Sequence, residues 1–537
     1  MNARHPLFAS FLILSLLALS GTFLILYATP QGMGLFDDSI AYIAGARSLL
    51  SGQGYREAWL ASNQPVTHFP PGFSSVLALV GISGLDPLRG TRFVNALIFG
   101  ANIFLLGLIG WRMTRSKAAG CVLAFLLLVN GQLFRVHTTA MSEPLYIFFT
   151  LAAFISFWHY FSSGYNKFLV LSAILTAFAY LTRYAGLALL ATFLVSLFIL
   201  HPTWRKRWTS IAIFLAGFIP FALAWSIRNR MLADNATNRT LVYHPITAEN
   251  IQLGIGNFAA FIFPVEAWRR ELSRIPDLFA VILAVLVLAL FVWVVSKGLK
   301  KFFNPATETP EILSFISTLY IFGYLASILS SMTLFDASTK FQLRIVAPMY
   351  VSLLIMLIYL GWWLWRKYVT SLRITNYASV RGFPVGRITF YAFIFFVFPT
   401  SILNFTDTLA QLRKGGQGYA SFQWFDSDGM KFLQTLPSET RIYSNETAPV
   451  YLYTDHPGYV LPDLVDPVTG LPRGNTDEGI AALQADVLSG EAALALFDFG
   501  SKSDDVQLIY RSLADGLHPA FDAQGDKIYT ASPVPQP

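Results

Sequence analysis

Charged residues are scarce in this chain of 537 residues, where Asp, Glu, Lys and Arg together make up 13% of the sequence. A soluble globular protein usually carries about twice that share. Hydrophobic residues reach 54% and gather in long runs, such as Phe279 to Ser296, that contain no charge. Runs of roughly 18 or more apolar residues can cross a bilayer core of about 30 Å. The scarcity of charge therefore excludes a soluble fold and indicates a chain that crosses a membrane many times.

Cysteine is nearly absent as well. The single cysteine, Cys121, lies inside an apolar run, so the chain can form neither an internal disulfide nor a cysteine-based metal site. The sequence also lacks an HExxH motif, a paired-histidine spacing, and a Walker or dinucleotide-binding loop. No resident metal or nucleotide cofactor is therefore predicted from a motif.

The apolar runs predict about eleven membrane-spanning helices. They lie roughly at residues 7–28, 90–111, 118–134, 144–162, 168–182, 185–200, 209–231, 278–296, 312–332, 345–365 and 388–406. The first run is too long for the apolar part of a signal peptide, so we expect it to be retained as a helix. Several runs are short, which indicates helices packed inside a bundle.

The charges outside the apolar runs predict the orientation. One set of connections carries basic clusters such as Arg205-Lys206-Arg207, whereas its acids are Glu308 and Glu311. The positive-inside rule places these connections and the N-terminus in the cytoplasm. An odd number of spans then places the C-terminal domain outside the plasma or inner membrane. The net charge of +7 therefore indicates anchoring among membrane lipids and no nucleic-acid partner.

The first predicted outer loop, roughly residues 29–89, contains two apolar stretches too short to span a bilayer. Ser39 to Leu50 has helical apolar spacing, which is typical of an amphipathic helix lying along the membrane surface. Gly72 to Leu85 follows a Pro-Pro turn and predicts a second interfacial segment. This loop is therefore expected to be structured.

The composition changes after about residue 407, where acidic residues become frequent. Strand-like and helical segments alternate there, with strands expected at 441–444, 493–499 and 527–530 and helices at 426–436, 478–488 and 504–513. Such alternation is typical of a small α/β domain. The predicted fold is mostly α, with a polytopic membrane helix bundle over residues 1–406 and a soluble extracytoplasmic α/β domain over 407–537.

Two adjacent acids, Asp37 and Asp38, follow the first predicted span in the segment LFDDSIAY. Carboxylates at a bilayer surface are costly to desolvate, and one of them could act as a general base toward an acceptor hydroxyl. The structural alternative is a cap on a helix that begins near Ser39, because Asp favours such positions. The pair could also bind a divalent cation, although two adjacent acids are weak evidence for one.

Single charges near the outer ends of predicted spans are the next candidates. Glu143 could face the same pocket as the acidic pair, or it could begin a helix together with Pro144. Arg183, Arg228 and Arg344 are suited to a phosphate, which a guanidinium binds through two hydrogen bonds. The alternative for each arginine is a side chain that extends to the lipid headgroups.

His68, in the segment HFPPGF, is the histidine that we single out. It could hydrogen-bond a sugar or a pyrophosphate, or it could be an ordinary loop residue. No metal-ligand spacing includes it.

These motifs occur in a recognisable order. After the acidic pair come Tyr42-x-x-Ala-x-Arg-x-Leu-Leu, Gly52-Gln-Gly54-Tyr55, His68-Phe-Pro-Pro and Arg92. Further on come Ser142-Glu143, Leu181-Thr-Arg183-Tyr, Trp225-x-x-Arg228-Asn229 and Arg344-x-x-x-Pro348. Over roughly residues 7–365 the chain resembles the polytopic glycosyltransferases of the GT-C superfamily, particularly protein O-mannosyltransferases and the aminoarabinose transferases that modify lipid A.

The resemblance implies an inverting transfer of a sugar from a polyprenyl-phosphate-linked donor to an acceptor of the cell envelope, on the outer face of the membrane. It implies that Asp37 is the base, that Asp38 is its acidic neighbour and that Glu143 is the acid of the second outer loop. It also implies donor phosphate contacts and substrate contacts from the following residues: Arg183, Arg344, Arg228 and Arg92 for the phosphate, and His68, Tyr42 and Tyr55 for the substrate.

The acceptor stays open between a glycan, a lipid and a protein. His68-Phe-Pro-Pro departs from the Glu-Lys-Pro-Pro pattern of the aminoarabinose transferases, which argues against the lipid A reaction. Two other classes of function also stay open, namely a transporter or flippase of lipid-linked glycans and a non-catalytic envelope scaffold. The acids outside the predicted spans and the lack of a repeat disfavour a transporter, and the intact acidic pair disfavours a scaffold.

Overall fold

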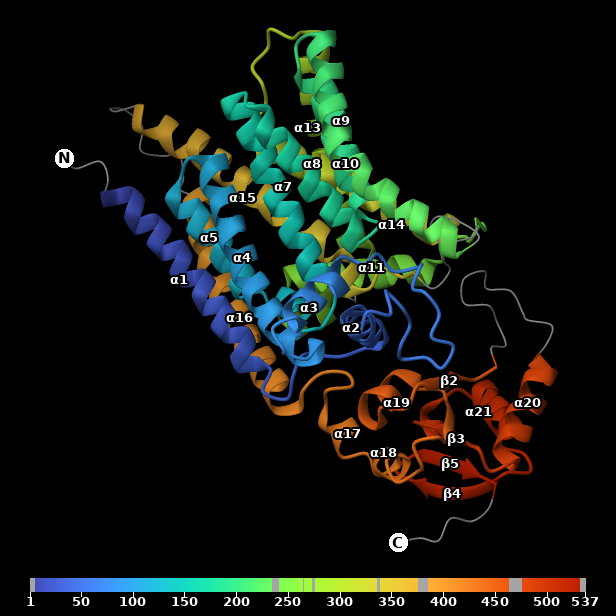
Figure 1. The fold of residues 1–537 in the computed structure, drawn as a ribbon. Helices are drawn as coiled ribbons and strands as arrows, with labels where there is room; N and C mark the ends of the chain where they lie inside the picture. The colour runs from blue at the N-terminus through green and yellow to red at the C-terminus, as the bar shows by residue number, and fades with distance from the viewer. Residues whose placement is uncertain are drawn as a thin grey trace.

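The computed structural model describes residues 5–233, 241–263, 265–272, 276–335, 339–374, 385–462 and 476–531. Figure 1 shows a bundle of long tilted helices with a small α/β region at one end. The helices of the bundle are α1 (His5–Ala28), α2 (Asp37–Leu50), α3 (Gly72–Gly81), α4 (Pro87–Thr114), α5 (Lys117–Leu128), α6 (Gly131–His137), α7 (Glu143–Ser163), α8 (Asn166–Thr182), α9 (Gly186–Leu200), α10 (Trp204–Leu232), α11 (Ala248–Ile262), α12 (Glu266–Leu272), α13 (Pro276–Phe303), α14 (Ile312–Leu334), α15 (Leu343–Ile374) and α16 (Val385–Gly415).

Each of the eleven predicted spans coincides with helix, but fewer pass as full spans. Within the described ranges, seven helices are long and apolar enough to cross a membrane, and the bent pair α5–α6 would make eight. The predicted count was higher because it included α8 and α9, which have 17 and 15 residues and so rise only roughly 26 and 23 Å. It also included the run 388–406 in α16, most of whose side chains lie outside the described residues. The chain is a multi-pass membrane protein.

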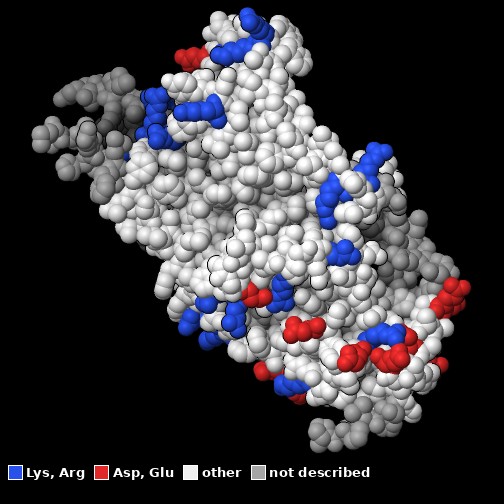
Figure 2. Space-filling view, in the orientation of Figure 1, with Lys and Arg blue, Asp and Glu red and all other residues white. Residues whose placement is uncertain are grey.

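The charged side chains are unevenly distributed over the surface of the molecule. Figure 2 shows a broad belt of uncharged surface in the middle of this face, with basic groups on both sides of it and most of the acidic groups at the end that holds the C-terminal strands. A belt without charge suits the hydrocarbon region of a bilayer, where an ionised side chain is costly.

The acidic pair stands in the first turn of α2. The helix begins at Asp37, and its N-terminal cap uses the Ser39 hydroxyl, which accepts a hydrogen bond from the backbone nitrogen of Phe36 at 3.1 Å. Neither aspartate caps the helix through its side chain, so the capping explanation for these two acids is wrong. Their negative charges still favour the positive end of the helix dipole.

We expected α2 to lie along the membrane surface, but in the structure it is largely buried. Nine of the fourteen residues of α2 are buried, and the helix packs against α3, α4 and a helix of the C-terminal region. Its apolar spacing therefore reflects burial within the protein, with protein on most sides. The second predicted segment forms α3, which ends at Gly81.

The C-terminal region, which we define as residues 416–531, contains one mixed five-stranded sheet in the order β2-β1-β3-β5-β4. Its elements are α17 (Phe422–Phe425), α18 (Asp428–Leu433), β1 (Arg441–Ser444), α19 (Thr447–Thr454), β2 (Gly458–Val460), α20 (Thr476–Leu488), β3 (Ala492–Leu496), the 3-10 turn η1 (Phe499–Ser501), α21 (Asp504–Leu513), β4 (His518–Ala523) and β5 (Asp526–Thr530). Strand β1 pairs in parallel with β2 and β3, whereas β5 pairs antiparallel with β3 and β4.

The central strand explains why the sheet is covered on both faces. All five residues of β3 are buried, as expected for a strand between two layers. Ala493 and Ala495 pack with residues of α18 and α19, whereas Leu494 and Leu496 pack with residues of α20 and α21. The predicted α/β class of this region is confirmed.

The C-terminal region docks on the first predicted outer loop, roughly residues 29–89, through backbone hydrogen bonds. The Leu35 nitrogen donates to the Gln417 carbonyl at 3.2 Å, and the Tyr419 nitrogen donates to the Leu35 carbonyl at 2.8 Å. Gly418 lies between them with φ +58°, and a Cβ there would lie 2.0 Å from the Leu35 carbonyl oxygen. Glycine is therefore required at this approach.

Candidate active site

A cavity of about 390 Å³ opens beside α2, α14 and α15. Three charged side chains line it, namely Asp38, Arg183 and Arg344, together with the rings of Tyr42 and His68. Further lining comes from hydroxyl-bearing and apolar side chains: Thr182, Tyr184, Tyr324, Ser327, Ser330, Ser331, Thr339, Phe69, Leu187 and Ile328. The cavity thus has one charged end and a wall of hydroxyl groups and apolar side chains, as ligand pockets commonly do.

Two ion pairs organise the charged end. Asp38 Oδ2 lies 2.6 Å from Arg344 Nη1, and Glu143 Oε1 lies 2.7 Å from Arg183 Nη1. The same Glu143 oxygen lies 3.9 Å from Arg344 Nη1. The two arginines therefore converge on one buried carboxylate, although they come from distant segments of the chain.

Glu143 is the buried carboxylate that both arginines face. Its side chain is fully buried at the first turn of α7, where the helix dipole favours a negative charge. Among the described residues, neither carboxylate oxygen has a hydrogen bond of good geometry, so the two arginines are its electrostatic partners. A buried carboxylate without such partners would be costly.

Ser142 and Tyr42 complete the wall next to Arg183. Arg183 Nη1 donates to Ser142 Oγ at 3.0 Å, and the Tyr42 hydroxyl lies 3.2 Å from the same oxygen. Burial raises the pKa of the Tyr42 phenol well above its ordinary value, which keeps it protonated as a neutral hydrogen-bonding group.

Asp37 points away from this network. Its Oδ1 accepts a hydrogen bond from the Tyr419 hydroxyl at 2.6 Å, and that hydroxyl also lies 3.1 Å from Glu446 Oε2. Both partners belong to the C-terminal region. The two adjacent acids therefore face different parts of the molecule: Asp38 lines the cavity, and Asp37 lies exposed at the junction with the C-terminal region.

His68 lies at the edge of the cavity. Its Nδ1 is 3.5 Å from Glu57 Oε1, and the neighbouring ring of Phe69 packs against Tyr42 with centroids 5.3 Å apart. Burial raises the pKa of the Glu57 carboxyl. These contacts hold the segment around His68 against α2.

Besides Asp37 and Glu143, three further predicted site residues do not line this cavity. Arg92 donates to the Leu26 carbonyl at the end of α1, and Tyr55 is buried with its hydroxyl 3.4 Å from Ser74 Oγ. Arg228 donates to the carbonyl oxygens of Val66 and Tyr55. Their contacts hold the first outer loop in place.

The sequence analysis missed several residues of the site. Ser142 and Tyr324 lie beside the ion pairs, and Tyr419 and Glu446 reach Asp37. Ser142 stands next to Glu143 and could have been found from that motif. Tyr419 and Glu446 carry no such signal, because only the fold brings them to Asp37.

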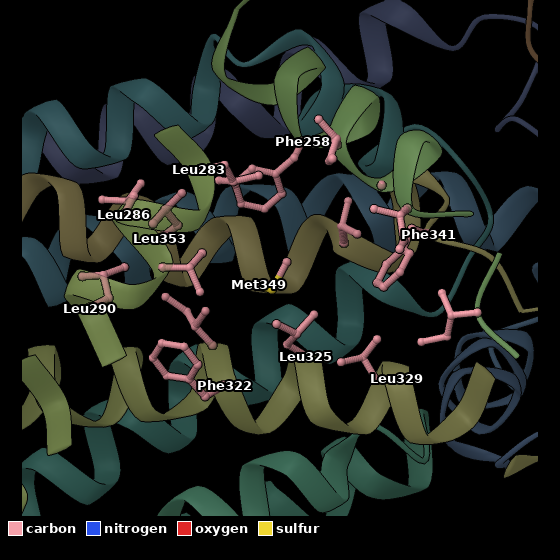
Figure 3. A pocket seen from close by; sticks show the side chains of 17 residues that line it. Phe258, Leu283, Leu286, Leu290, Phe322, Leu325, Leu329, Phe341, Met349 and Leu353 are labelled. Atoms are coloured by element: carbon pink, nitrogen blue, oxygen red, sulfur yellow. The ribbon is translucent and has the colours of Figure 1, made fainter. Parts of the chain in front are cut away.

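A second cavity lies on the other face of α14. Its volume is about 360 Å³, and its lining residues, which come largely from α11, α13, α14 and α15, are all apolar. Figure 3 shows Phe258, Phe322, Met349 and their neighbours pointing into one space. Residues of α14 alternate between the two cavities: Leu325 and Leu329 line the apolar one, whereas Tyr324 and Ile328 line the charged one.

No group of three or more His, Cys, Asp or Glu side chains that could hold a metal ion occurs in the part of the chain that the structure describes. The two carboxylates of the predicted cation site have separate partners, Arg344 and Tyr419.

Comparisons with known proteins agree with this architecture. Residues 82–228 match the family model of dolichyl-phosphate-mannose-protein mannosyltransferases. The structure of ArnT from Cupriavidus metallidurans bound to undecaprenyl phosphate aligns with a TM-score of 0.51 and 13% identity, covering 99% of this chain and 100% of that one. The chain has the GT-C fold.

A second GT-C structure supports the assignment. The archaeal oligosaccharyltransferase AglB from Archaeoglobus fulgidus, in complex with an inhibitory peptide and a dolichol phosphate, aligns with a TM-score of 0.52 and 11% identity. The alignment covers 100% of this chain and 75% of AglB. A search of curated protein sequences gives no significant match. The predicted resemblance to GT-C glycosyltransferases is confirmed.

Proposed function

We propose that this GT-C protein is a membrane glycosyltransferase that moves a sugar from a polyprenyl-phosphate-linked donor to an envelope acceptor, with inversion, on the outer face of the membrane. The observation that carries the proposal is the pair of arginines, Arg183 and Arg344, held by Glu143 and Asp38 at the end of a cavity. An apolar cavity lies across the same helix.

The arginines supply the phosphate site. A guanidinium binds phosphate oxygens in a fixed geometry, and carboxylates already orient both cations. When polyprenyl phosphate leaves the sugar, its new negative charge would develop next to them. Stabilising such charge with preorganised groups is usually the largest contribution to catalysis. Arg228 and Arg92 stay predicted donor contacts. Both donate hydrogen bonds to backbone carbonyl groups and so help to fix the loop.

The apolar cavity suits the isoprenoid part of the donor. Its lining consists of apolar side chains from α11, α13, α14 and α15, including Phe258, Phe322 and Met349. Burying such a chain releases about 25 cal/mol for each Å² of apolar surface removed from water. The two cavities on α14 would thus hold the two ends of one amphipathic donor.

Asp37 is the base in this proposal. An inverting displacement places the acceptor opposite the departing phosphate, and Asp37 points away from the arginines toward the C-terminal region. Its carboxylate takes the proton of the acceptor hydroxyl as the bond from the acceptor oxygen to the anomeric carbon forms. The bond from that carbon to the phosphate oxygen breaks, and its electron pair leaves with the polyprenyl phosphate. Tyr42 and His68 would contact the sugar.

A divalent cation shared by Asp37 and Asp38 does not fit this arrangement well. The two carboxylates make hydrogen bonds with Tyr419 and Arg344 on different sides of α2. We therefore expect transfer to continue in the presence of EDTA, and a loss restored by one added divalent cation would reverse this assignment.

The location follows from the charges. We propose a plasma or inner membrane protein with a cytoplasmic N-terminus and an extracytoplasmic C-terminal domain from about residue 407, because the basic clusters lie in the connections at the opposite end. The acidic pair and the cavity then face the outer side, where the acceptor is found.

The test is a transfer assay with protein reconstituted in lipid nanodiscs. A panel of polyprenyl-phosphate hexoses and pentoses would be incubated with an envelope extract as the source of the acceptor. We expect one donor to lose its sugar to the extract and to release polyprenyl phosphate. A donor that crosses a vesicle membrane intact would indicate a flippase, and no change in any donor would favour a scaffold.

A further inference from the structure

The hydrogen bond between Tyr419 and Asp37 joins the C-terminal region to the proposed base. Tyr419 is fixed through its backbone: its nitrogen donates to the Leu35 carbonyl at 2.8 Å, and its carbonyl accepts from the Tyr453 hydroxyl at 2.5 Å. A phenol held in this way defines the direction of the Asp37 carboxylate, which is otherwise exposed.

A second carboxylate competes for the same phenol. Glu446 Oε2 lies 3.1 Å from the Tyr419 hydroxyl, and Asp37 Oδ1 lies 2.6 Å from it. A hydroxyl has one proton and can donate it to one carboxylate at a time. When Glu446 is ionised, it therefore draws the proton away from Asp37, whereas a protonated Glu446 can donate to the phenol oxygen.

The surroundings of Glu446 set where this change occurs. Burial raises the pKa of its carboxyl, and hydrogen bonding to Tyr419 opposes the rise. The charged and titratable groups facing Glu446, besides Asp37 and Tyr419, are Lys502 with its Nζ 3.9 Å from Glu446 Oε1, Asp498 and Tyr510. Burial also raises the pKa of the Tyr419 phenol, so Tyr419 remains a donor.

We propose that Tyr419 and Glu446 are positioning residues for Asp37, through which the C-terminal region sets the direction and the basicity of the base. This inference rests on the proposed function, in which Asp37 accepts the acceptor's proton. It adds a role for the C-terminal region that the cavity residues alone do not provide.

The two residues have opposite effects, which makes the inference testable. Tyr419→Phe removes a donor that stabilises the ionised Asp37 carboxylate, so chemical labelling of its protonated form should extend to higher pH. Glu446→Gln removes a neighbouring negative charge and a competitor for the phenol, so the same labelling should retreat to lower pH.

The experiment reads the titration of Asp37 directly in the full chain. A water-soluble carbodiimide labels protonated carboxyl groups, and peptide mass spectrometry would follow the labelling of Asp37 against pH in the wild type and both variants. The acid limb of the transfer rate should move in the same direction in each variant. Tyr443→Phe and Glu491→Gln change the same residue types in the C-terminal region away from Asp37, and they should leave both curves in place.

The outcomes separate this inference from the proposed function. Unshifted labelling curves in both variants, or curves that move in the same direction, would overturn the positioning roles. Shifted labelling without any sugar transfer by the wild type would retain the coupling and contradict the glycosyltransferase proposal instead. A lower transfer rate with an unmoved acid limb would leave Tyr419 a merely structural residue.

Discussion

Two adjacent acids of the same type acquire different roles through their partners. Asp38 pairs with Arg344, which is 306 residues away in the sequence, and Asp37 accepts from Tyr419, which is 382 residues away. The sequence predicted that both acids belong to the site, because their position after a long apolar run is local information. The sequence could not show that the two acids face different partners, because only the folded chain brings those partners near.

Asp37→Asn tests the base. The variant keeps the size of the side chain but cannot take a proton at neutral pH, so we expect the transfer rate to fall at least roughly 100-fold. Its melting temperature should stay within about 2 °C of the wild type, since Asp37 is exposed. Asp428→Asn, a half-exposed change in the C-terminal region, is the control for both readings. Full transfer by Asp37→Asn would remove Asp37 from the mechanism.

Glu143→Gln tests the buried ion pairs. It leaves Arg183 without its 2.7 Å partner inside the protein, and breaking such a pair costs on the order of 3–5 kcal/mol. We expect a clearly lower melting temperature in detergent. Glu266→Gln is the matched control, because its pair with Arg270 is largely exposed and contributes little. Equal melting temperatures for the two variants would show that Glu143 does not support the arginines.

At the scale of elements, apolar periodicity predicted most helices well, because a long apolar run has few alternatives to a helix in a membrane. The strands β2 and β4 were missed. β2 has three residues, and β4 contains Pro519 at the edge of the sheet, so neither has the alternating pattern of a buried strand. The burial of α2 was missed for another reason, namely that its covering elements lie elsewhere in the sequence.

Gly418→Ala tests the docking of the C-terminal region on the first outer loop. The new Cβ would meet the Leu35 carbonyl oxygen, and the backbone there is left-handed, so we expect faster limited proteolysis of the link after α16. Gly415→Ala is the control three residues earlier, because it has open space around its Cβ position and lies at the end of α16. Identical proteolysis of the two variants would argue against a fixed junction.

At the scale of the whole molecule, the membrane bundle and the C-terminal region contact each other directly. Arg47 on α2 contacts the Tyr451 hydroxyl of α19 at 3.4 Å, and the Gly458 nitrogen donates to the Trp59 carbonyl at 2.9 Å. The composition predicted both parts of the chain. It gave no information about their contact, because docking depends on single glycines and hydrogen bonds.

The orientation belongs to this scale as well. A reporter fused after residue 415 should report an extracytoplasmic location. A reporter fused in the connection around Arg205 should report a cytoplasmic location. The opposite pattern would place the acidic pair on the cytoplasmic side and would contradict an outer-face transfer.

The central claim is that the chain cleaves a lipid-linked sugar donor and passes the sugar on. The most direct measurement follows polyprenyl phosphate and glycosylated acceptor together, by mass spectrometry, with reconstituted wild-type protein and the Arg344→Gln variant. We predict equal amounts of the two products from the wild type and at least a tenfold lower rate from the variant, because one phosphate contact is lost. Intact donor in the presence of acceptor, or donor moved across the bilayer without cleavage, would contradict the claim.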